Sequence, residues 1–338
     1  MDLDDFDPDG PGGDSLFGLP HTADEAAVIV VPVPWDATTS YRQGTAQAPA
    51  NVLEASGQLD LFDLQTGEAW REGIVMSPID PRVQGWSEQA SAAVVTARAS
   101  DGKARDEAAA QADAYAEQLT TWLHGQIGGL LSAGKIPAVL GGDHSVPLGA
   151  ITAAAEAVPG LGILHVDAHL DLRVAYEGFT QSHASILYNA LQRAPSLGNI
   201  AQVGIRDIGS REWATVEQEP RLHVFSDPML ADELSAGTPW NDLIERILAP
   251  LPSTVWITLD IDGLDPSLCP TTGTPVPGGL SWAQITTLLA ALARSGRRIV
   301  GFDLVEVGPG DWDAIVGARL LFKLATWAIT TNRQPAST

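Results

Sequence analysis

The feature that most limits the fold of this chain is a series of short apolar runs that alternate with helical patterns. Each run is almost continuously apolar, as expected of strands buried on both faces of a sheet. The apolar runs occupy 26–34, 134–145, 161–173, 200–207, 222–226, 253–263 and 297–307. Helical spacing covers 51–59, about 106–133, 145–157, 182–194, about 281–295 and about 311–330. This alternation predicts an α/β fold in which helices cover both faces of a parallel sheet.

The alternation continues along the chain without an internal repeat, a linker or a second hydrophobic pattern. We therefore expect a single domain over 21–338, preceded by a disordered acidic leader over 1–20. Two segments are expected to be irregular. One is a polar loop over 36–50, and the other is an Ala-rich loop over 84–108 that leads into the long helix.

Charge and cysteine content exclude several classes of partner. Asp and Glu number 42 against 19 Lys and Arg, which gives a formal net charge of -23. Nucleic acid is excluded because phosphate binding needs a basic surface. Cys269 is the single cysteine, so the chain has neither an intramolecular disulfide nor a thiolate metal site. The apolar runs are too short to span a membrane, and the acidic start differs from a signal peptide. These features predict a cytoplasmic protein without a membrane partner.

Polar clusters follow four of the apolar runs, in the stretches LGGDHS, HVDAHLD, TLDIDGLDPS and DLVEVGP. Ligands of α/β proteins bind at the carboxyl ends of the strands, so these clusters are expected to lie at a shared site. Residues two apart on a strand point to the same face. Asp167, His169 and Asp171 have this spacing, and so do Asp260 and Asp262.

The clusters contain two imidazoles and four carboxylates that are candidate metal ligands: His144, Asp167, His169, Asp171, Asp260 and Asp262. Four negative charges match two divalent cations. This donor set suits Mn²⁺, with Ni²⁺ as an alternative. Two such ions would lower the pKa of a bridging water and so predict metal-activated hydrolysis. A single Asp at a strand end is usually a cap, and a single buried His is usually a core residue. Four clusters with matched spacing favour the metal site, and we expect His165 to lie behind it.

The stretches GGDHS, DAHLD and DIDGLDPS resemble the three signatures of the ureohydrolase superfamily, which contains the arginases and agmatinases. The resemblance extends from VPVPWDATTSYRQGT to VGARLLFKL. It implies a three-layer α/β/α fold with a central parallel sheet. It also implies that the six residues hold two Mn²⁺ ions, with Asp167 and Asp260 among the bridging ligands. Assembly into a homotrimer or homohexamer is implied as well.

Two further residues match the family by their position in its motifs. Glu306, in DLVEVGP, matches the carboxylate that binds the guanidinium group. Its charge pairs well with a planar guanidinium. His183, in SHAS, matches the histidine that carries a proton to the leaving amine, and imidazole titrates near neutral pH. The alternatives are an ordinary ion pair for Glu306 and a structural role for His183.

Differences from the arginase sequence pattern reduce the number of candidate substrates. Arg173 stands where arginases carry an Asn, and no Ser-Gly-Asn run precedes His183, which argues against arginine. The run DLR…YEG…SHAS resembles the agmatinase branch of the family. This resemblance makes agmatine, which carries two positive charges, the favoured substrate. Thr38, Thr39, Arg173 and Glu177 are expected to contact it.

Other substrates and other classes of protein remain open at this point. Small hydroxyls in DATTSY and the Pro-rich loop TTGTPVPGGL would also suit free guanidine and a nickel-dependent guanidine hydrolase. A guanidino acid or formimidoylglutamate would use Arg173 as its carboxylate partner. A catalytically silent subunit is a further alternative, but it would not need all six candidate ligands together with Glu306 and His183. A two-metal phosphoesterase would bring more than one Arg to the ligand motifs.

Overall fold

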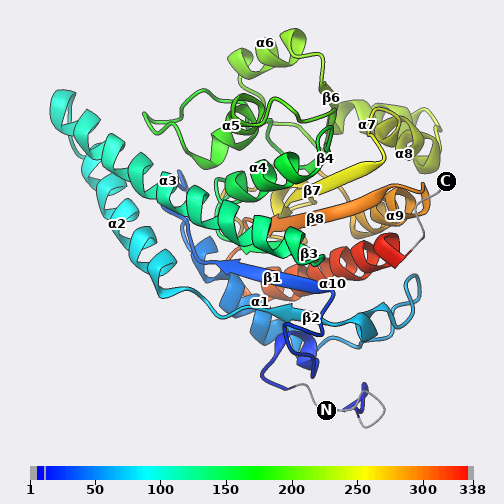
Figure 1. The fold of residues 1–338 in the computed structure, drawn as a ribbon. Helices are drawn as coiled ribbons and strands as arrows, with labels where there is room; N and C mark the ends of the chain where they lie inside the picture. Colours follow the sequence, from blue (N-terminus) through cyan, green and yellow to red (C-terminus); the bar gives the residue numbers. More distant parts are fainter. Residues whose placement is uncertain (1–5, 11–12, 334–338) are drawn as a thin grey trace.

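The structure is a computed structural model that describes residues 6–10 and 13–333. Its centre is an eight-stranded sheet with the strand order β2-β1-β3-β8-β7-β4-β5-β6 (Figure 1), and every described pairing between neighbouring strands is parallel. The strands are β1 Val28–Val33, β2 Ile74–Met76, β3 Ile136–Gly141, β4 Gly162–Val166, β5 Ile200–Val203, β6 Leu222–Phe225, β7 Thr254–Asp260 and β8 Arg298–Val305.

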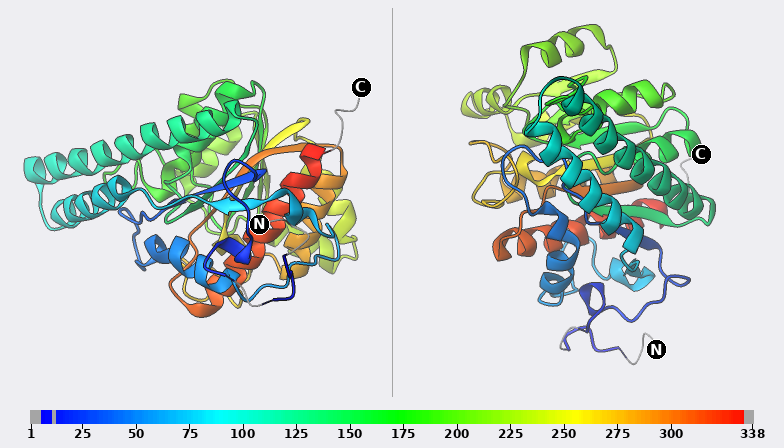
Figure 2. Two further views of the ribbon diagram at one scale, coloured as in Figure 1. Left: turned by 60° about the horizontal axis from the view of Figure 1, so that its bottom comes forward. Right: turned by 90° about the vertical axis from the view of Figure 1, so that its left-hand side faces the viewer.

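Helices cover both faces of this sheet (Figure 2). They are α1 Ala48–Ser56, α2 Pro81–Arg98, α3 Gly102–Ser132, α4 Leu148–Ala157, α5 Ile186–Arg193, α6 Ser210–Gln218, α7 Asp227–Ser235, α8 Trp240–Leu248, α9 Trp282–Arg294 and α10 Asp311–Arg333. Successive residues along a strand point to opposite faces of the sheet and pack into two separate hydrophobic cores. On β4, Ile163 packs with the core of α3, α4 and α5, whereas Leu164 and Val166 pack with the core of α1, α8, α9 and α10. The predicted three-layer α/β/α fold is confirmed.

The strand order explains how distant motifs meet. β8 and β7 lie between β3 and β4, so four strand ends from separate parts of the chain are neighbours. The pairings Leu140↔Leu304, Asp260↔Val305 and Val166↔Leu259 bring these ends to one level. The polar residues that follow β3, β4, β7 and β8 therefore collect at the centre of one sheet edge.

The predicted loop over 84–108 is wrong: this region forms an antiparallel pair of helices, α2 and α3, joined at 99–101. The pair projects beyond the sheet (Figures 1 and 2). Pro81 starts α2, and the Asp80 carboxylate accepts a hydrogen bond from the Arg82 backbone nitrogen. The buried face of α2 is mostly Ala and Ser, so its hydrophobic periodicity is weak. β2 and helices α6 to α8 were not predicted either.

The start of the chain also differs from the expected leader over 1–20. Residues 1–5 and 11–12 of that range lie outside the described part of the structure. Leu16–Gly18 form a 3-10 turn in which Leu16 and Phe17 are buried. The Phe17 ring contacts the Phe322 ring of α10 at a centroid distance of 5.0 Å. Core packing therefore begins before residue 21, because three apolar side chains in LFGL find a place against α10 and α1.

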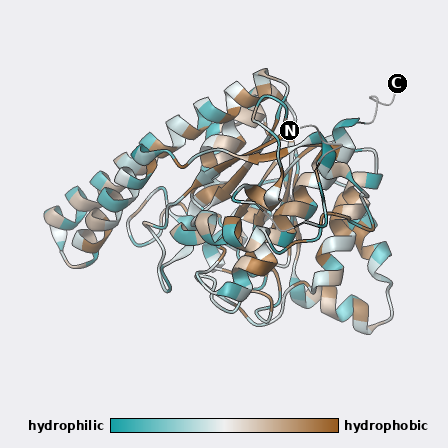
Figure 3. Ribbon diagram, turned by 90° about the horizontal axis from the view of Figure 1, so that it is seen from below, coloured by the Kyte–Doolittle hydropathy of each residue, from teal (hydrophilic) through white to brown (hydrophobic). Residues whose placement is uncertain are grey.

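Helix α10 is long and apolar enough to cross a membrane by length and composition alone. However, 78% of its apolar window is buried inside the protein. It packs against β8, α9 and α1 as a core helix. The ribbon coloured by hydropathy shows the hydrophobic residues concentrated on the strands and on the helix faces that cover them (Figure 3).

Candidate metal centre and substrate cavity

One group of side chains surrounds the Nδ1 atom of His144, directly after β3. This atom lies 2.9 Å from Asp167 Oδ2, 3.0 Å from Asp171 Oδ2 and 3.4 Å from Asp260 Oδ2. All four side chains are buried. Burial alone would lower the pKa of His144, but the three carboxylates outweigh it and hold the pKa well above its ordinary value. The carboxylates thus favour a positive charge at this position.

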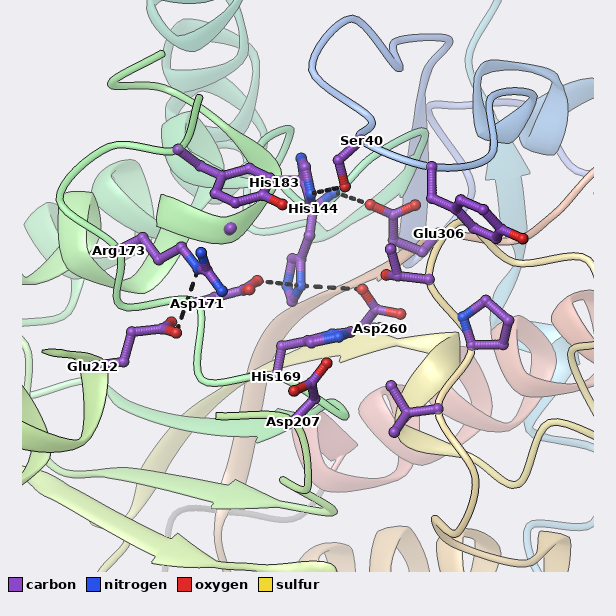
Figure 4. Close-up of a pocket in the computed structure, with 16 residues that line it drawn as sticks. Ser40, His144, His169, Asp171, Arg173, His183, Asp207, Glu212, Asp260 and Glu306 are labelled. Carbon is purple, nitrogen blue, oxygen red and sulfur yellow. Dashed lines mark hydrogen bonds and ion pairs between the residues drawn. The ribbon is translucent and has the colours of Figure 1, made fainter. Parts of the chain in front are cut away.

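A second group lies beside the first. His169 Nδ1 is 3.3 Å from Asp167 Oδ1 and 3.2 Å from Asp262 Oδ2. Asp167 therefore directs one oxygen to each group, as a bridging carboxylate would. Asp260 joins the two through its Oδ1 atom, which accepts a hydrogen bond from the Asp262 backbone nitrogen at 2.8 Å. The six predicted ligands are brought together as two adjacent groups, and Figure 4 shows four of them, His144, His169, Asp171 and Asp260.

These residues fit a pair of divalent cations. His144 Nδ1 is buried without a hydrogen bond of acceptable geometry, although three carboxylate oxygens surround it. A buried nitrogen in this state is costly unless a cation is coordinated. Imidazole and carboxylate donors in this mixture suit Mn²⁺ and neighbouring first-row ions.

The predicted strand through Asp171 is too long. β4 ends at Val166, and only an isolated bridge between His169 and Asp207 continues the pairing. Asp171 reaches back to His144 because its backbone adopts the left-handed conformation, with φ 54°. Glu306 has a similar φ of 59°. Non-glycine residues in this region carry strain, which is typical of functional sites.

A buried polar row on the sheet orients the ligands from behind. His144 Nε2–H donates to Thr258 Oγ1 at 2.9 Å, and the Thr258 hydroxyl donates to Asp303 Oδ1 at 2.7 Å. Trp256 Nε1 donates to Asp303 Oδ2 at 2.6 Å. Burial raises the pKa of Asp303 to about 6. The row fixes the His144 tautomer that leaves Nδ1 free for a metal ion. His165 lies behind Asp167, with its Nε2 atom 2.9 Å from Asp167 Oδ2.

Replacing Thr258 by valine is expected to lower metal affinity about 10-fold to 100-fold, because the His144 ring loses the acceptor that orients it. Titration of the metal-free protein with Mn²⁺ against a competing chelator measures this change. Thr326→Val is a matched control, since this buried hydroxyl in α10 bonds only to helix carbonyls. Equal Mn²⁺ affinity in Thr258→Val and the wild type would exclude this role.

Glu306 faces a cavity of about 260 Å³ at the same sheet edge (Figure 4). Its Oε1 atom accepts a hydrogen bond from the His144 backbone nitrogen at 3.0 Å. Its Oε2 atom is buried and has no hydrogen-bond partner among the residues that the structure describes. Burial raises the pKa of Glu306 well above its ordinary value. A side chain on Gly273 would place its Cβ 3.1 Å from Oε2, so the glycine leaves room for a group that pairs with this oxygen.

His183 lies across the cavity from the metal ligands, in the 3-10 turn His183–Ser185. Its Nδ1 atom is 3.4 Å from Thr38 Oγ1, and its Nε2 atom is 3.5 Å from Ser40 Oγ. The Tyr176 ring meets the imidazole edge-on at a centroid distance of 5.6 Å. Burial lowers the pKa of His183 to about 3, so the imidazole is neutral at neutral pH.

Of the residues predicted to contact the substrate, some line the cavity and others do not. Arg173 lines the cavity, where it stacks on Tyr176 with its Cζ atom 4.5 Å from the ring centroid. Thr38, Thr39 and Glu177 are not among the lining residues. Thr38 supports His183, as described above, whereas Thr39 donates its hydroxyl to the Asp36 carbonyl at 3.1 Å.

The stretch DATTSY and the Pro-rich loop were expected near the site, and they supply Ser40, Tyr41 and 274–276 to the cavity wall. Sequence reasoning missed two acidic residues of the wall. Asp207 and Glu212, which come after β5, also line the cavity. Only the strand-end position of Asp207, in the stretch GIRD, could have indicated them.

Comparisons with known proteins agree with this geometry. The model of the arginase family matches residues 26–326. An N(1)-aminopropylagmatine ureohydrolase of Thermus thermophilus is 36% identical over 296 residues, which cover 87% of each chain. An agmatinase of Bacillus anthracis is 29% identical over 85% of each chain. The crystal structure of an agmatine ureohydrolase of Thermoplasma volcanium has the same fold, with a TM-score of 0.70, 24% identity and 97% coverage of both chains.

Proposed function

Since the chain belongs to the arginase family and is a ureohydrolase, we propose that it hydrolyses agmatine or an extended, amine-tailed relative of agmatine. The observation that carries this proposal is the buried, unpartnered Oε2 atom of Glu306 beside two groups of metal ligands. A carboxylate with a free oxygen pairs strongly with a guanidinium. The reaction joins water to the guanidinium carbon and breaks one C–N bond, which gives urea and an amine.

The side chains have distinct tasks in this reaction. The six ligands hold two divalent cations, which supply a nucleophilic water at neutral pH. Glu306 binds the guanidinium and orients its carbon toward the metal ligands. His183 transfers a proton to the leaving nitrogen, because its imidazole faces the cavity beside Ser40 and Tyr176.

The size and charge of the cavity favour a substrate with a tail. A volume of about 260 Å³ corresponds to roughly nine water molecules. Two metal ions and one water use about three of these volumes, and the rest exceeds the four non-hydrogen atoms of guanidine. The carboxylate of Asp207 on the wall suits a cationic tail. The charge of Arg173 is offset by Glu212, whose Oε2 atom lies 3.4 Å from Arg173 Nε.

The proposal extends to the metal and the assembly. We favour Mn²⁺, with Ni²⁺ as the alternative, because the donors are imidazole and carboxylate. A homotrimer or homohexamer in the cytoplasm is part of the same proposal, since it is typical of the family that the motifs resemble.

Urea release tests the substrate. Protein loaded with Mn²⁺ or with Ni²⁺ is assayed with agmatine, N(1)-aminopropylagmatine, free guanidine and 4-guanidinobutyrate. We expect turnover of the two amine-tailed compounds and at least about 100-fold lower kcat/KM for guanidine, because guanidine lacks the tail contacts. Preferred turnover of guanidine or of the guanidino acid would contradict the proposal. Absence of turnover with all four would support a silent subunit instead.

A further inference from the structure

We propose that Arg98, on the projecting α2–α3 helix pair, is a positioning residue for His183. This inference rests on the proposed function, because it assigns a task to the helix pair in the same reaction. Arg98 lies in the last turn of α2, in the segment expected from its composition to be a loop. It contacts both loops that flank His183.

The first of these loops runs from Tyr176 to Gln181 and is attached to the helix pair. Tyr176 and Phe179 exchange two backbone hydrogen bonds across a two-residue turn, in which Glu177 has φ 52° and Gly178 has φ 95°. The Phe179 side chain is 1% exposed and packs between alanines of α2 and α3.

The same loop is held to α3 by polar contacts further along. The backbone nitrogens of Thr180 and Gln181 donate to the Asp113 carboxylate. Gln181 also bonds to the side chains of Glu117 and Thr120. These contacts end two residues before His183, so the helix pair determines the path by which the chain enters the active site.

Arg98 joins this loop to the second one. Its Nη2 and Nε atoms bind Glu177 Oε2 at 2.6 Å and 2.8 Å. The same Nη2 atom donates to the carbonyls of Thr38 and Thr39 at 3.2 Å and 3.1 Å. Glu177 has a left-handed backbone, which is strained in a non-glycine residue, and its ion pair with Arg98 holds it there. One guanidinium therefore fixes the distance between the two loops.

Both loops contact the imidazole of His183 directly. The Thr38 hydroxyl accepts a hydrogen bond from the His183 backbone nitrogen at 3.2 Å and lies near Nδ1. Tyr176 packs against the ring from the other loop. Arg98 itself makes no contact with the cavity. Its side chain is 32% exposed, so we expect its ion pair to add little to global stability. Loss of Arg98 would instead allow the two loops to move apart, and the position of the His183 imidazole would no longer be fixed.

The variant Arg98→Ala is expected to lower kcat about 30-fold, with less than a 3-fold change in KM and unchanged metal content, because a misplaced catalytic group slows the chemical step. Arg98→Lys should recover only part of kcat, since an ammonium cannot span Glu177 and two carbonyls as a planar guanidinium does. Arg82→Ala is the matched control on the same helix. Arg82 pairs with Asp80 far from both loops and should leave kcat unchanged.

A double-mutant cycle separates positioning of His183 from a general structural effect. In the His183→Ala background, Arg98→Ala should reduce kcat less than 3-fold further, because the group that it positions is already absent. A full 30-fold loss in that background would overturn the proposal, and so would an unchanged kcat in Arg98→Ala alone.

Limited proteolysis gives a readout that does not depend on activity. Chymotrypsin cleaves after Tyr176 and Phe179, and cleavage there should become faster in Arg98→Ala but not in Arg82→Ala. Faster cleavage with normal urea release would show that the loops are held together without serving His183, which overturns the inference. A wild type that cleaves no guanidino compound would overturn the proposed function instead, whatever the proteolysis shows.

Discussion

Replacing Asp167 by alanine is expected to abolish urea release, with a loss of more than about 1,000-fold, and to remove both metal ions. The reason is the double contact of this carboxylate. Its Oδ2 atom faces His144 and its Oδ1 atom faces His169, so neither ligand group is complete without it. Asp260→Ala should have the same effect. Metal per chain is measured by plasma mass spectrometry, and activity by urea release.

A matched variant separates loss of a ligand from loss of charge. Asp207→Ala removes a carboxylate from the cavity wall but none of the six ligands, and it should retain two metal ions per chain. Two bound ions and normal turnover in Asp167→Ala would refute the assignment of this residue as a bridging ligand.

Glu306→Gln is expected to keep both metal ions and to lose substrate. Glutamine preserves the shape of the side chain and an oxygen for the His144 backbone nitrogen. It removes the charge that pairs with the guanidinium. Charge-assisted hydrogen bonds contribute about 1.5–3 kcal/mol each, so we expect kcat/KM for agmatine to fall about 100-fold to 1,000-fold, mainly through weaker binding. Calorimetric titration of the metal-loaded variant measures the affinity.

Gly273→Ala provides a second approach to the same oxygen without a change of charge. Its Cβ atom would lie 3.1 Å from Glu306 Oε2, where the guanidinium is proposed to bind. A smaller loss of agmatine affinity with normal metal content is expected. Unchanged affinity in Glu306→Gln would remove this residue from the binding site.

The fold and the clustering of the six candidate ligands could be predicted because their signals are local. Apolar runs identify the buried strands, and polar residues at the strand ends identify the site. The helix α2 gives only a weak signal, because four of its six buried residues are alanine or serine. Spacing also cannot show that β4 ends at Val166, or that a left-handed backbone at Asp171 brings its carboxylate back to His144.

Contacts that depend on strand order could not be predicted from sequence. Thr258 lies between His144 and Asp303 only because β7 is paired with β8 in a particular register. Similarly, Glu177 is close in sequence to Arg173, but the turn at Glu177 directs its side chain to Arg98 on a distant helix. Glu177 was expected to contact the substrate, but it pairs with Arg98 and does not line the cavity.

The position of β7 and β8 between β3 and β4 has a consequence for biosynthesis. Asp167 and His144 follow strands that belong to one sheet only through β7 and β8, which lie within residues 254–305. When the first 250 residues have been synthesised, the candidate ligands that follow β3 and β4 are present, but the metal site is incomplete. Closing the sheet requires contacts between distant parts of the chain, which form slowly. We therefore expect metal binding to follow the pairing of β7 and β8, and we expect a truncated chain that lacks β8 to bind no metal at this site.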